Sequence, residues 1–185
     1  MRTTILAILL LVSSTTVDAK LKIETRVDRL TKQTITQADG LKVCQPRDSG
    51  AFAKCATVKL AWIATQADSV AIRLEFPETV SIQEVAINVD GVVQAFKATT
   101  ASTDFGFDPN LARVGMSGAS SANTFLISIA ALRALSKDAS SGILRVSGPH
   151  SSIDFDFWRQ AKMKGLPVDD LRQFLDAVAP MAAAQ

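Results

Sequence analysis

The chain is poor in the side chains that carry out most enzyme chemistry. It has one histidine, His150, no tyrosine and only two cysteines among 185 residues. General acid–base and nucleophilic catalysis need proton-exchanging or attacking groups held within reach of one another. Because this inventory is so small, we expect a protein that is not an enzyme and that uses neither a cofactor nor a bound metal.

Neither sign of charge is in marked excess. The 20 Lys and Arg residues against 18 Asp and Glu residues give a formal net charge of +2. Nucleic-acid binding depends largely on basic surface, so we expect no nucleic-acid partner.

After the N-terminal segment, no apolar run approaches the roughly 18 residues that indicate a membrane-spanning helix. With 48% hydrophobic and 21% charged residues, the composition is typical of a folded domain.

Residues 1–19 have the pattern of a secretory signal peptide. Arg2 supplies a positive charge, residues 5–12 (ILAILLLV) form an apolar run, and Ala19 is a small residue at the expected cleavage point. Such a run is much shorter than the roughly 20 residues of a membrane-spanning helix. We therefore expect cleavage, location in the periplasm or outside the cell, and a single β-rich domain over residues 20–185.

Cys44 and Cys55 are suited to a disulfide in an exported protein. An oxidising compartment favours the bond, and the segment between them contains Pro46, Gly50 and several charges, as a surface loop would. A metal site or a redox-active dithiol is the alternative, but the single histidine is distant and the Cys-x-x-Cys spacing is absent. We predict a structural disulfide.

Alternation of apolar and polar residues predicts a domain built mainly from antiparallel strands. The predicted strands cover residues 21–29, 31–37, 57–64, 70–76, 80–89, 92–98, 124–128, 143–146 and 153–157. Asp39-Gly40 and Asp90-Gly91 are turn signals, and the second is typical of a two-residue hairpin loop. We expect an antiparallel β-sandwich, with a flattened barrel as the alternative.

Two helices complete the expected fold. Apolar residues at helical spacing predict a short helix over residues 129–137, with Ser128 as its N-cap. Pro167 is suited to the first turn of a C-terminal helix. The apolar stripe of that helix comprises Leu171, Phe174, Leu175 and Val178. The predicted fold class is therefore mainly β, at the margin of α+β.

Residues 99–123 are rich in Ser, Thr, Gly and Asp, which predicts a long polar loop that is either functional or mobile. Phe105 and Phe107 stand out within it. Aromatic side chains in a polar loop either insert into the core or are presented to a partner. Core insertion is the ordinary interpretation, whereas presentation would make the two side chains anchors of a binding surface.

A second candidate region surrounds His150, which lies in a turn between two predicted strands, close in sequence to Arg145. Its imidazole could anchor a partner or form a pH-sensitive contact, although most such residues are simply exposed. Asp154 and Asp156 follow on one face of the next strand. With His150 they could form the acid–base set of a hydrolase, but alternating Asp and Phe is also typical of a strand with one solvated face.

These patterns together predict an exported, non-catalytic binding module. Its expected partner is another protein of the bacterial envelope, with the module acting as an inhibitor, an immunity protein or an assembly factor. The candidate contact residues are Phe105, Phe107, Arg145 and His150. Two alternatives stay open: a β domain that encloses a small apolar ligand, and a hydrolase that uses Asp154, Asp156 and His150.

Overall fold

The computed structural model describes residues 21–45, 55–113, 117–137, 142–150, 152–157 and 167–182. The expected signal peptide lies outside the described residues. The strands are β1 (Lys22–Val27), β2 (Thr34–Cys44), β3 (Cys55–Ile63), β4 (Ser69–Phe76), β5 (Glu84–Val89), β6 (Val92–Lys97), β7 (Asp104–Phe107), β8 (Ala119–Ser128), β9 (Ile143–Ser147) and β10 (Ser152–Asp156). The helices are α1 (Pro109–Arg113), α2 (Ile129–Ser136) and α3 (Pro167–Ala182), with a 3₁₀ turn, η2 (Ala64–Gln66), after β3.

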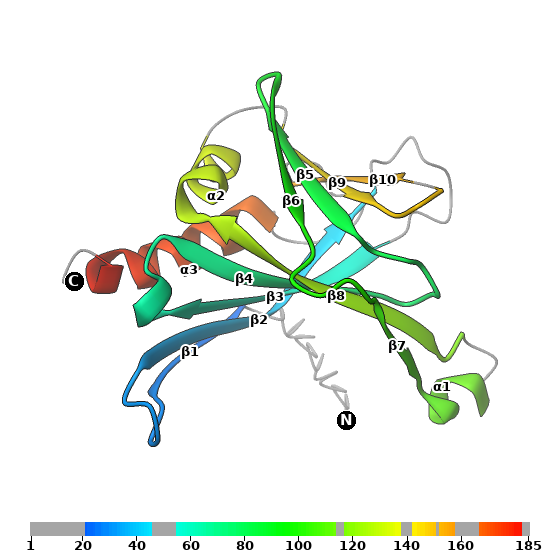
Figure 1. Ribbon diagram of the computed structural model, residues 1–185, viewed down its shortest axis with the longest axis horizontal. Coiled ribbons are helices and arrows are strands. Elements are labelled where there is room, and N and C mark those ends of the chain that lie inside the picture. Colours follow the sequence, from blue (N-terminus) through cyan, green and yellow to red (C-terminus); the bar gives the residue numbers. More distant parts are fainter. Residues whose placement is uncertain are drawn as a thin grey trace, which may run out of the picture.

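The ten strands found in these ranges form one antiparallel sheet (Figure 1). Its order is β6-β5-β9-β10-β2-β3-β4-β8-β7, and β1 pairs with β2 beside this path. The hairpin predicted at Asp90-Gly91 is confirmed, because the two residues join β5 to β6 with φ angles of +50° and +86°. Positive φ at both positions is what a type I′ turn requires.

Strand β2 connects two parts of the sheet. Its first half, up to Asp39, pairs with β1, whereas its last residue, Cys44, pairs with Asp156 of β10. Between the two halves the register with β3 shifts at a bulge, where Gly40 has a φ of +101°. Asp39-Gly40 is therefore a bulge inside a longer strand and not the turn predicted from the sequence. Glycine's tolerance of positive φ is useful in both settings, so the dipeptide does not distinguish them.

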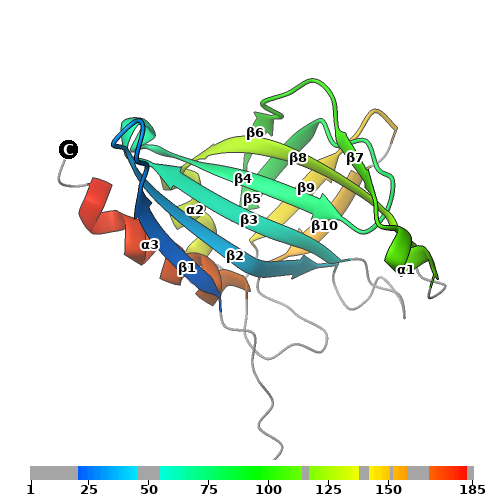
Figure 2. The same cartoon turned by 90° about the horizontal axis from the view of Figure 1, so that it is seen from below.

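The sheet curls over on itself, so that its inner face surrounds the core. Figure 2 shows β9 and β10 behind β3 and β4. The rings of Phe76 on β4 and Phe155 on β10 lie 5.5 Å apart between centroids, although these strands are not neighbours in the sheet. Near the other end, Ala98 bridges to Phe125 of β8, but the sheet is not closed.

The predicted β-sandwich was wrong, because the described residues contain no second sheet. Every strand predicted from alternation is present, and the mainly β class with a short and a C-terminal helix is confirmed. The wrong part of the prediction is that the buried faces of the strands belong to two facing sheets, whereas they belong to one curled sheet. One sheet that curls and two sheets that face each other both give each strand one buried side, so alternation does not separate the two arrangements.

Helices α2 and α3 lie together on one side of the curled sheet (Figure 1). Helix α2 contacts β5 and β8, and α3 contacts α2 and β2. The predicted N-cap is confirmed, since Ser128 Oγ accepts a hydrogen bond of 3.2 Å from the backbone N–H of Ala131. All four residues of the predicted stripe on α3 are buried. In the part of the chain that the structure describes, no helix is both long and apolar enough to cross a membrane.

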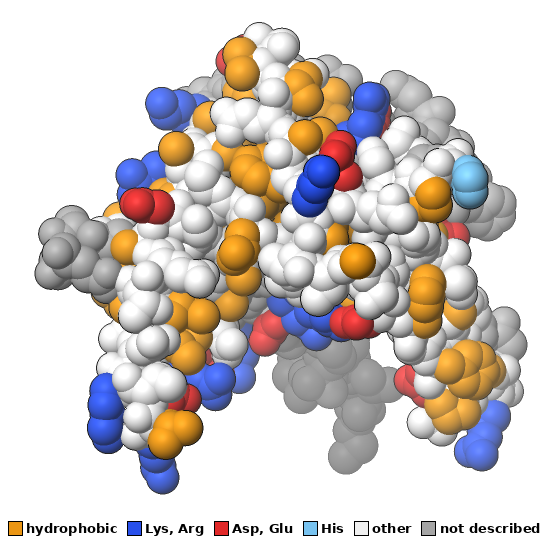
Figure 3. All heavy atoms as spheres, in the orientation of Figure 1, with side chains coloured by type: hydrophobic (Ala, Val, Ile, Leu, Met, Phe, Trp, Pro, Cys, Tyr) orange, Lys and Arg blue, Asp and Glu red, His pale blue; other side chains and the backbone are white. Residues whose placement is uncertain are grey.

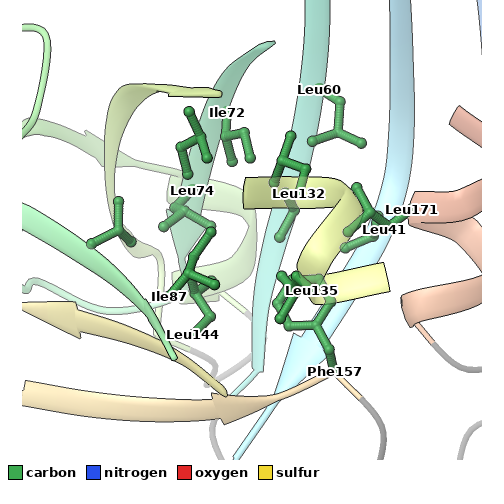
Figure 4. Close-up of a pocket in the computed structure, with 13 residues that line it drawn as sticks. Leu41, Leu60, Ile72, Leu74, Ile87, Leu132, Leu135, Leu144, Phe157 and Leu171 are labelled. Atoms are coloured by element: carbon green, nitrogen blue, oxygen red, sulfur yellow. The ribbon is translucent and has the colours of Figure 1, made fainter. Parts of the chain in front are cut away.

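The core is tightly filled. Its buried apolar residues form one cluster with contributions from both parts of the sheet and from α2 and α3. Figure 4 shows leucine and isoleucine side chains from these elements converging on a cavity, and its volume is only about 10 Å³. A small-molecule site needs roughly 300–1,000 Å³. The interior therefore gives no support to the alternative of an enclosed apolar ligand.

The predicted disulfide between Cys44 and Cys55 is confirmed. The two residues are register partners in β2 and β3, with Cα atoms 4.0 Å apart. Cys44 is also the residue of β2 that pairs with Asp156 of β10. The covalent bond therefore lies where the two parts of the sheet join.

Replacing both cysteines with alanine should lower the free energy of unfolding by about 3 kcal/mol, because the cross-link restricts the unfolded chain. The measurement is urea unfolding of the variant Cys44→Ala/Cys55→Ala beside the oxidised wild type. Reductant should destabilise the wild type by a similar amount and leave the double variant unchanged. Equal stability of the oxidised wild type and the variant would contradict the expected role of the bond.

Candidate functional site

The segment predicted as a long polar loop, residues 99–123, contains secondary structure, so that prediction was wrong. It holds β7, α1 and the first half of β8 (Figure 1). The strand pattern was hidden because the inward positions of β8 carry Ser121 and Asn123 instead of apolar residues. Both are buried, at 1% and 2% exposure. Their polar groups are satisfied by hydrogen bonds, which an analysis of hydrophobic alternation does not detect.

These two buried side chains attach the neighbouring segments to β8. The Asn123 side-chain amide donates to the carbonyl oxygen of Ile82 (2.8 Å), and its Oδ1 accepts from Thr100 Oγ1 (3.1 Å). Ser121 Oγ donates to the carbonyl oxygen of Glu78 (2.8 Å). The segment between β4 and β5, and Thr100 on the chain that leads to β7, are thus attached to β8 by polar contacts.

Two glycines permit the close approach of β7 and α1 to β8. A Cβ atom on Gly118 would overlap the carbonyl oxygen of Asp108, and one on Gly106 would lie 2.6 Å from Ser120 Oγ. The backbone N–H of Asp108 donates to the carbonyl oxygen of Gly118 (2.7 Å). Asp108 Oδ1 in turn accepts from the N–H of Asn110 (2.8 Å) at the start of α1. A side chain at position 118 would separate these elements.

Strand β7 is the last strand of the sheet, and Figure 2 shows it at the border beside β8. Phe105 and Phe107 lie two residues apart and therefore share one face. They are register partners of Ser121 and Ala119, with 60% and 69% of their surface exposed. Of the two interpretations left open by the sequence, the structure shows exposed side chains and not core residues. We call Phe105 and Phe107 the β7 patch.

The backbone of the β7 patch also faces outward. In an antiparallel pair, residues alternate between directing their peptide groups toward the partner strand and away from it. Because Asp108 N–H bonds to Gly118, the in-register residues Asp104 and Gly106 also face β8. The N–H and C=O groups of Phe105 and Phe107 therefore point to the open edge. The same two residues present aromatic rings and strand-edge groups with which no strand of the described ranges pairs.

The opposite face of β7 is acidic. Asp104 lies on the other side of the strand from the two phenylalanines, and Asp108 follows directly after β7, where its backbone N–H bonds to Gly118 and its carboxylate caps the start of α1. Asp104 Oδ2 accepts a hydrogen bond of 2.9 Å from Arg73 on β4, which holds β7 across β8. This hydrogen bond is the main reason why the pKa of Arg73 is raised. The edge thus has one aromatic face and one face with the carboxylate of Asp104.

A groove beside α1 was not anticipated from the sequence. It has a volume of about 470 Å³ and is lined in part by Lys42, Thr57, Glu75 and Leu111. Leu111 is 40% exposed, and Figure 3 shows hydrophobic side chains gathered over the region of β7 and α1. Helix α1 has only five residues, which is too short for an apolar period to reveal it.

Arg145, also predicted as a contact residue, has a partner within the protein. Its Nε and Nη2 atoms bond to Oδ1 and Oδ2 of Asp154 at 2.6 and 2.8 Å, across the register of β9 and β10. In the sheet, β9 is separated from β7 by β10, β2, β3, β4 and β8. His150 is exposed between β9 and β10. Because the sheet curls, strand order does not measure the distance to the β7 patch; Gly148, two residues before His150, lies against the carbonyl oxygen of Ser81, and the neighbouring Ile82 N–H bonds to Thr103 just before β7.

The Asp154–Arg145 pair also affects the hydrolase alternative. The hydrogen bond from Arg145 lowers the pKa of Asp154, with burial opposing the effect. A general acid that works near neutral pH needs the opposite shift. Among the described residues, no group of three or more His, Cys, Asp or Glu side chains could hold a metal ion.

Comparisons of the chain with protein-family models, curated proteins and solved structures give no match. The β7 patch is therefore interpreted from its own geometry.

Gly118→Ala should release β7 from β8 while leaving the core folded, because the added methyl group displaces the backbone of Asp108. Losing the bond between these residues should cost about 1 kcal/mol or more of local stability. Amide exchange at Asp108 should become faster, with core amides unchanged. Gly106→Ala is the matched comparison, since its clash involves Ser120 Oγ, and adding Ser120→Ala should relieve it. If the Asp108 amide exchanges at the same rate in Gly118→Ala as in the wild type, the expected release of β7 is wrong.

Asp154→Asn should reduce stability only where the Asp154 carboxylate is charged. A lowered pKa in the folded state means that the pair stabilises the protein above the ordinary value of 3.8 and that the effect is lost as pH falls through the folded-state pKa. Because the pair is exposed, at most about 1 kcal/mol is expected at pH 7. Urea unfolding at pH 7 and pH 2.5, with an Arg145→Met double-mutant cycle, measures it. If the free energies of unfolding of the wild type and Asp154→Asn differ by the same amount at both pH values, the ion pair is excluded as the cause.

Proposed function

We propose that the protein is an exported, non-catalytic binding module that captures another protein of the bacterial envelope through the β7 patch. The observation that carries the proposal is the exposure of Phe105 and Phe107 on one face of an edge strand. Burying a phenylalanine side chain is worth roughly 1.5–3 kcal/mol, so a partner that covers both rings gains a substantial part of its binding energy. Aromatic anchors of this kind dominate many protein interfaces.

The remaining features agree with this role. The Cys44–Cys55 disulfide suits a periplasmic or secreted protein, as does the signal-peptide pattern of residues 1–19. The β7 patch is held on a sheet, and a rigid element presents anchors at lower entropic cost than a free loop. An inhibitor, an immunity protein or an assembly factor would use such a surface. Arg145 and His150 are secondary candidates, since Arg145 is already paired with Asp154 and His150 lies between β9 and β10.

The test is affinity capture from envelope extract with the wild type and with Phe105→Ala/Phe107→Ala. The wild type should retain one dominant partner, and loss of two anchors should weaken its binding by about 4 kcal/mol, or roughly 1,000-fold in Kd. Both melting temperatures should agree closely, because exposed substitutions usually change stability by less than about 0.5 kcal/mol.

Val92→Ala/Val93→Ala is the matched control, because these side chains are 64% and 60% exposed on β6. This variant should retain the partner. A strong fall in the melting temperature of the phenylalanine variant would show that the rings support the fold. Equal capture by both variants would refute the proposed role of the β7 patch.

A further inference from the structure

The open edge of β7 indicates how the partner is held. We propose that an extended segment of the partner adds to β7 as a further strand of the sheet, with apolar side chains over Phe105 and Phe107 alternating with basic ones. This inference deepens the binding function proposed above and rests on it. It commits to a mode of contact, main-chain pairing, and to the chemistry of the segment that pairs.

The first support is the direction of the backbone groups. Phe105 and Phe107 direct two N–H and two C=O groups to the open edge, because the bond from Asp108 to Gly118 turns the alternate residues toward β8. An added strand can satisfy all four groups. Main-chain pairing of this kind supplies affinity, and the side chains at alternate positions supply specificity.

The second support is the separation of chemistry between the faces of β7. On an added strand, residues opposite Phe105 and Phe107 meet aromatic rings, where apolar side chains pack well. Residues between them lie beside Gly106, beside Asp104, which already pairs with Arg73, and beside Asp108, whose Oδ1 caps the start of α1. Opposite charges are favourable at such neighbouring positions. The edge therefore favours a segment in which apolar and basic residues alternate.

The charges disfavour a second copy of this chain as the occupant. Residues 104–108 read DFGFD in both directions. Two β7 strands paired antiparallel about Gly106 would set Asp104 of one copy opposite Asp108 of the other. Like charges directly opposite each other are destabilising. A basic segment from a different protein removes this repulsion and keeps the contacts to the rings.

The other two edge strands are less suited to this role. Strand β1 alternates Lys22, Glu24 and Arg26 along its length, and charges are a common device against strand addition. On β6, Val92 and Val93 are both exposed, but adjacent residues of a strand point to opposite faces. Only β7, among the described edge strands, places two large exposed apolar side chains on one face.

The first experiment uses a capped synthetic peptide, Lys-Val-Lys-Val-Lys-Val, added to the disulfide-bonded protein up to about 1 mM, a range that detects weak binding. The amide signals of Phe105 and Phe107 should shift and become protected from exchange. Those of Gly106 and Asp108 should already be protected in the free protein. The same peptide N-methylated at its valines should not bind, because its pairing edge is blocked. No response at Phe105 and Phe107 overturns the proposal.

The second experiment separates the backbone contact from the ring. Phe107→Ala and Phe107→Pro both remove the ring, but only proline removes the outward N–H. Proline is tolerated where an edge N–H faces solvent, so the two variants should have similar melting temperatures. The proline variant should bind the peptide about fivefold more weakly than the alanine variant, as expected for one hydrogen bond.

The possible failures are distinguishable. Equal binding by Phe107→Ala and Phe107→Pro, with partner capture still dependent on the rings, overturns strand addition and leaves the proposed function standing. Protection of the Phe105 amide that rises with protein concentration alone would identify a second copy as the occupant and also overturn the inference. If partner capture is insensitive to Phe105→Ala/Phe107→Ala, the proposed function itself fails.

Discussion

The bend of β2 at Asp39 and Gly40 determines how one sheet can enclose a core. A straight strand of the length of β2 would extend about 36 Å. Each of its edges would pair with a single neighbouring strand along that whole length. Because the bulge increases the local bend and twist, the edge of β2 passes from β1 to β10. Strands β10, β9, β5 and β6 then lie over β3 and β4, which brings Phe155 against Phe76. Helices α2 and α3 complete the enclosure.

The exposure of the β7 patch follows from the same arrangement. Strand β8 borders the apolar core through Phe125 and Ile127, and its first half lies beside the core residues Leu74 and Phe76 of β4. There the inward positions are Ser121 and Asn123, which bind backbone groups of the segment around Glu78 and Ile82. The segment around Glu78 and Ile82 occupies the inward side of this half of β8, and the phenylalanine side chains of β7 are left exposed. Their exposure is a property of where β7 lies and not of a disordered loop.

Much of this fold could be predicted from the sequence because its signals are local. Alternation identified the strands with apolar inward positions, Ser128 marked the start of α2, and the stripe from Leu171 to Val178 marked α3. The curl of the sheet was not predictable in this way, since it depends on whether Asp39-Gly40 ends a strand or bends it. The first half of β8 escaped because Ser121 and Asn123, and not apolar residues, occupy its inward positions, and β7 escaped because its alternation covers only four residues within a polar stretch.

From the sequence, the rings of Phe105 and Phe107 could be predicted only to be either buried in the core or exposed to a partner. The sequence singled out Phe105 and Phe107, but whether an aromatic ring is buried depends on contacts with residues distant in the chain, here around positions 78–82. Arg145 was singled out as a candidate contact residue, and the register of β9 and β10 places Asp154 directly opposite it. Such pairings are set by strand register and are not visible in composition or spacing.

The position of the disulfide has a consequence for the order of assembly. Cys44 and Cys55 are 11 residues apart within the hairpin of β2 and β3, so they meet through a short loop whose closure costs little entropy. On its other edge, Cys44 pairs with Asp156 of β10. The two residues are separated by a far longer stretch of chain, and contacts between residues so distant in sequence form slowly. In a chain that emerges from its N-terminus, oxidation can fix the hairpin before β10 is present. The C-terminal strands and α3 then dock onto a template that is already covalently closed.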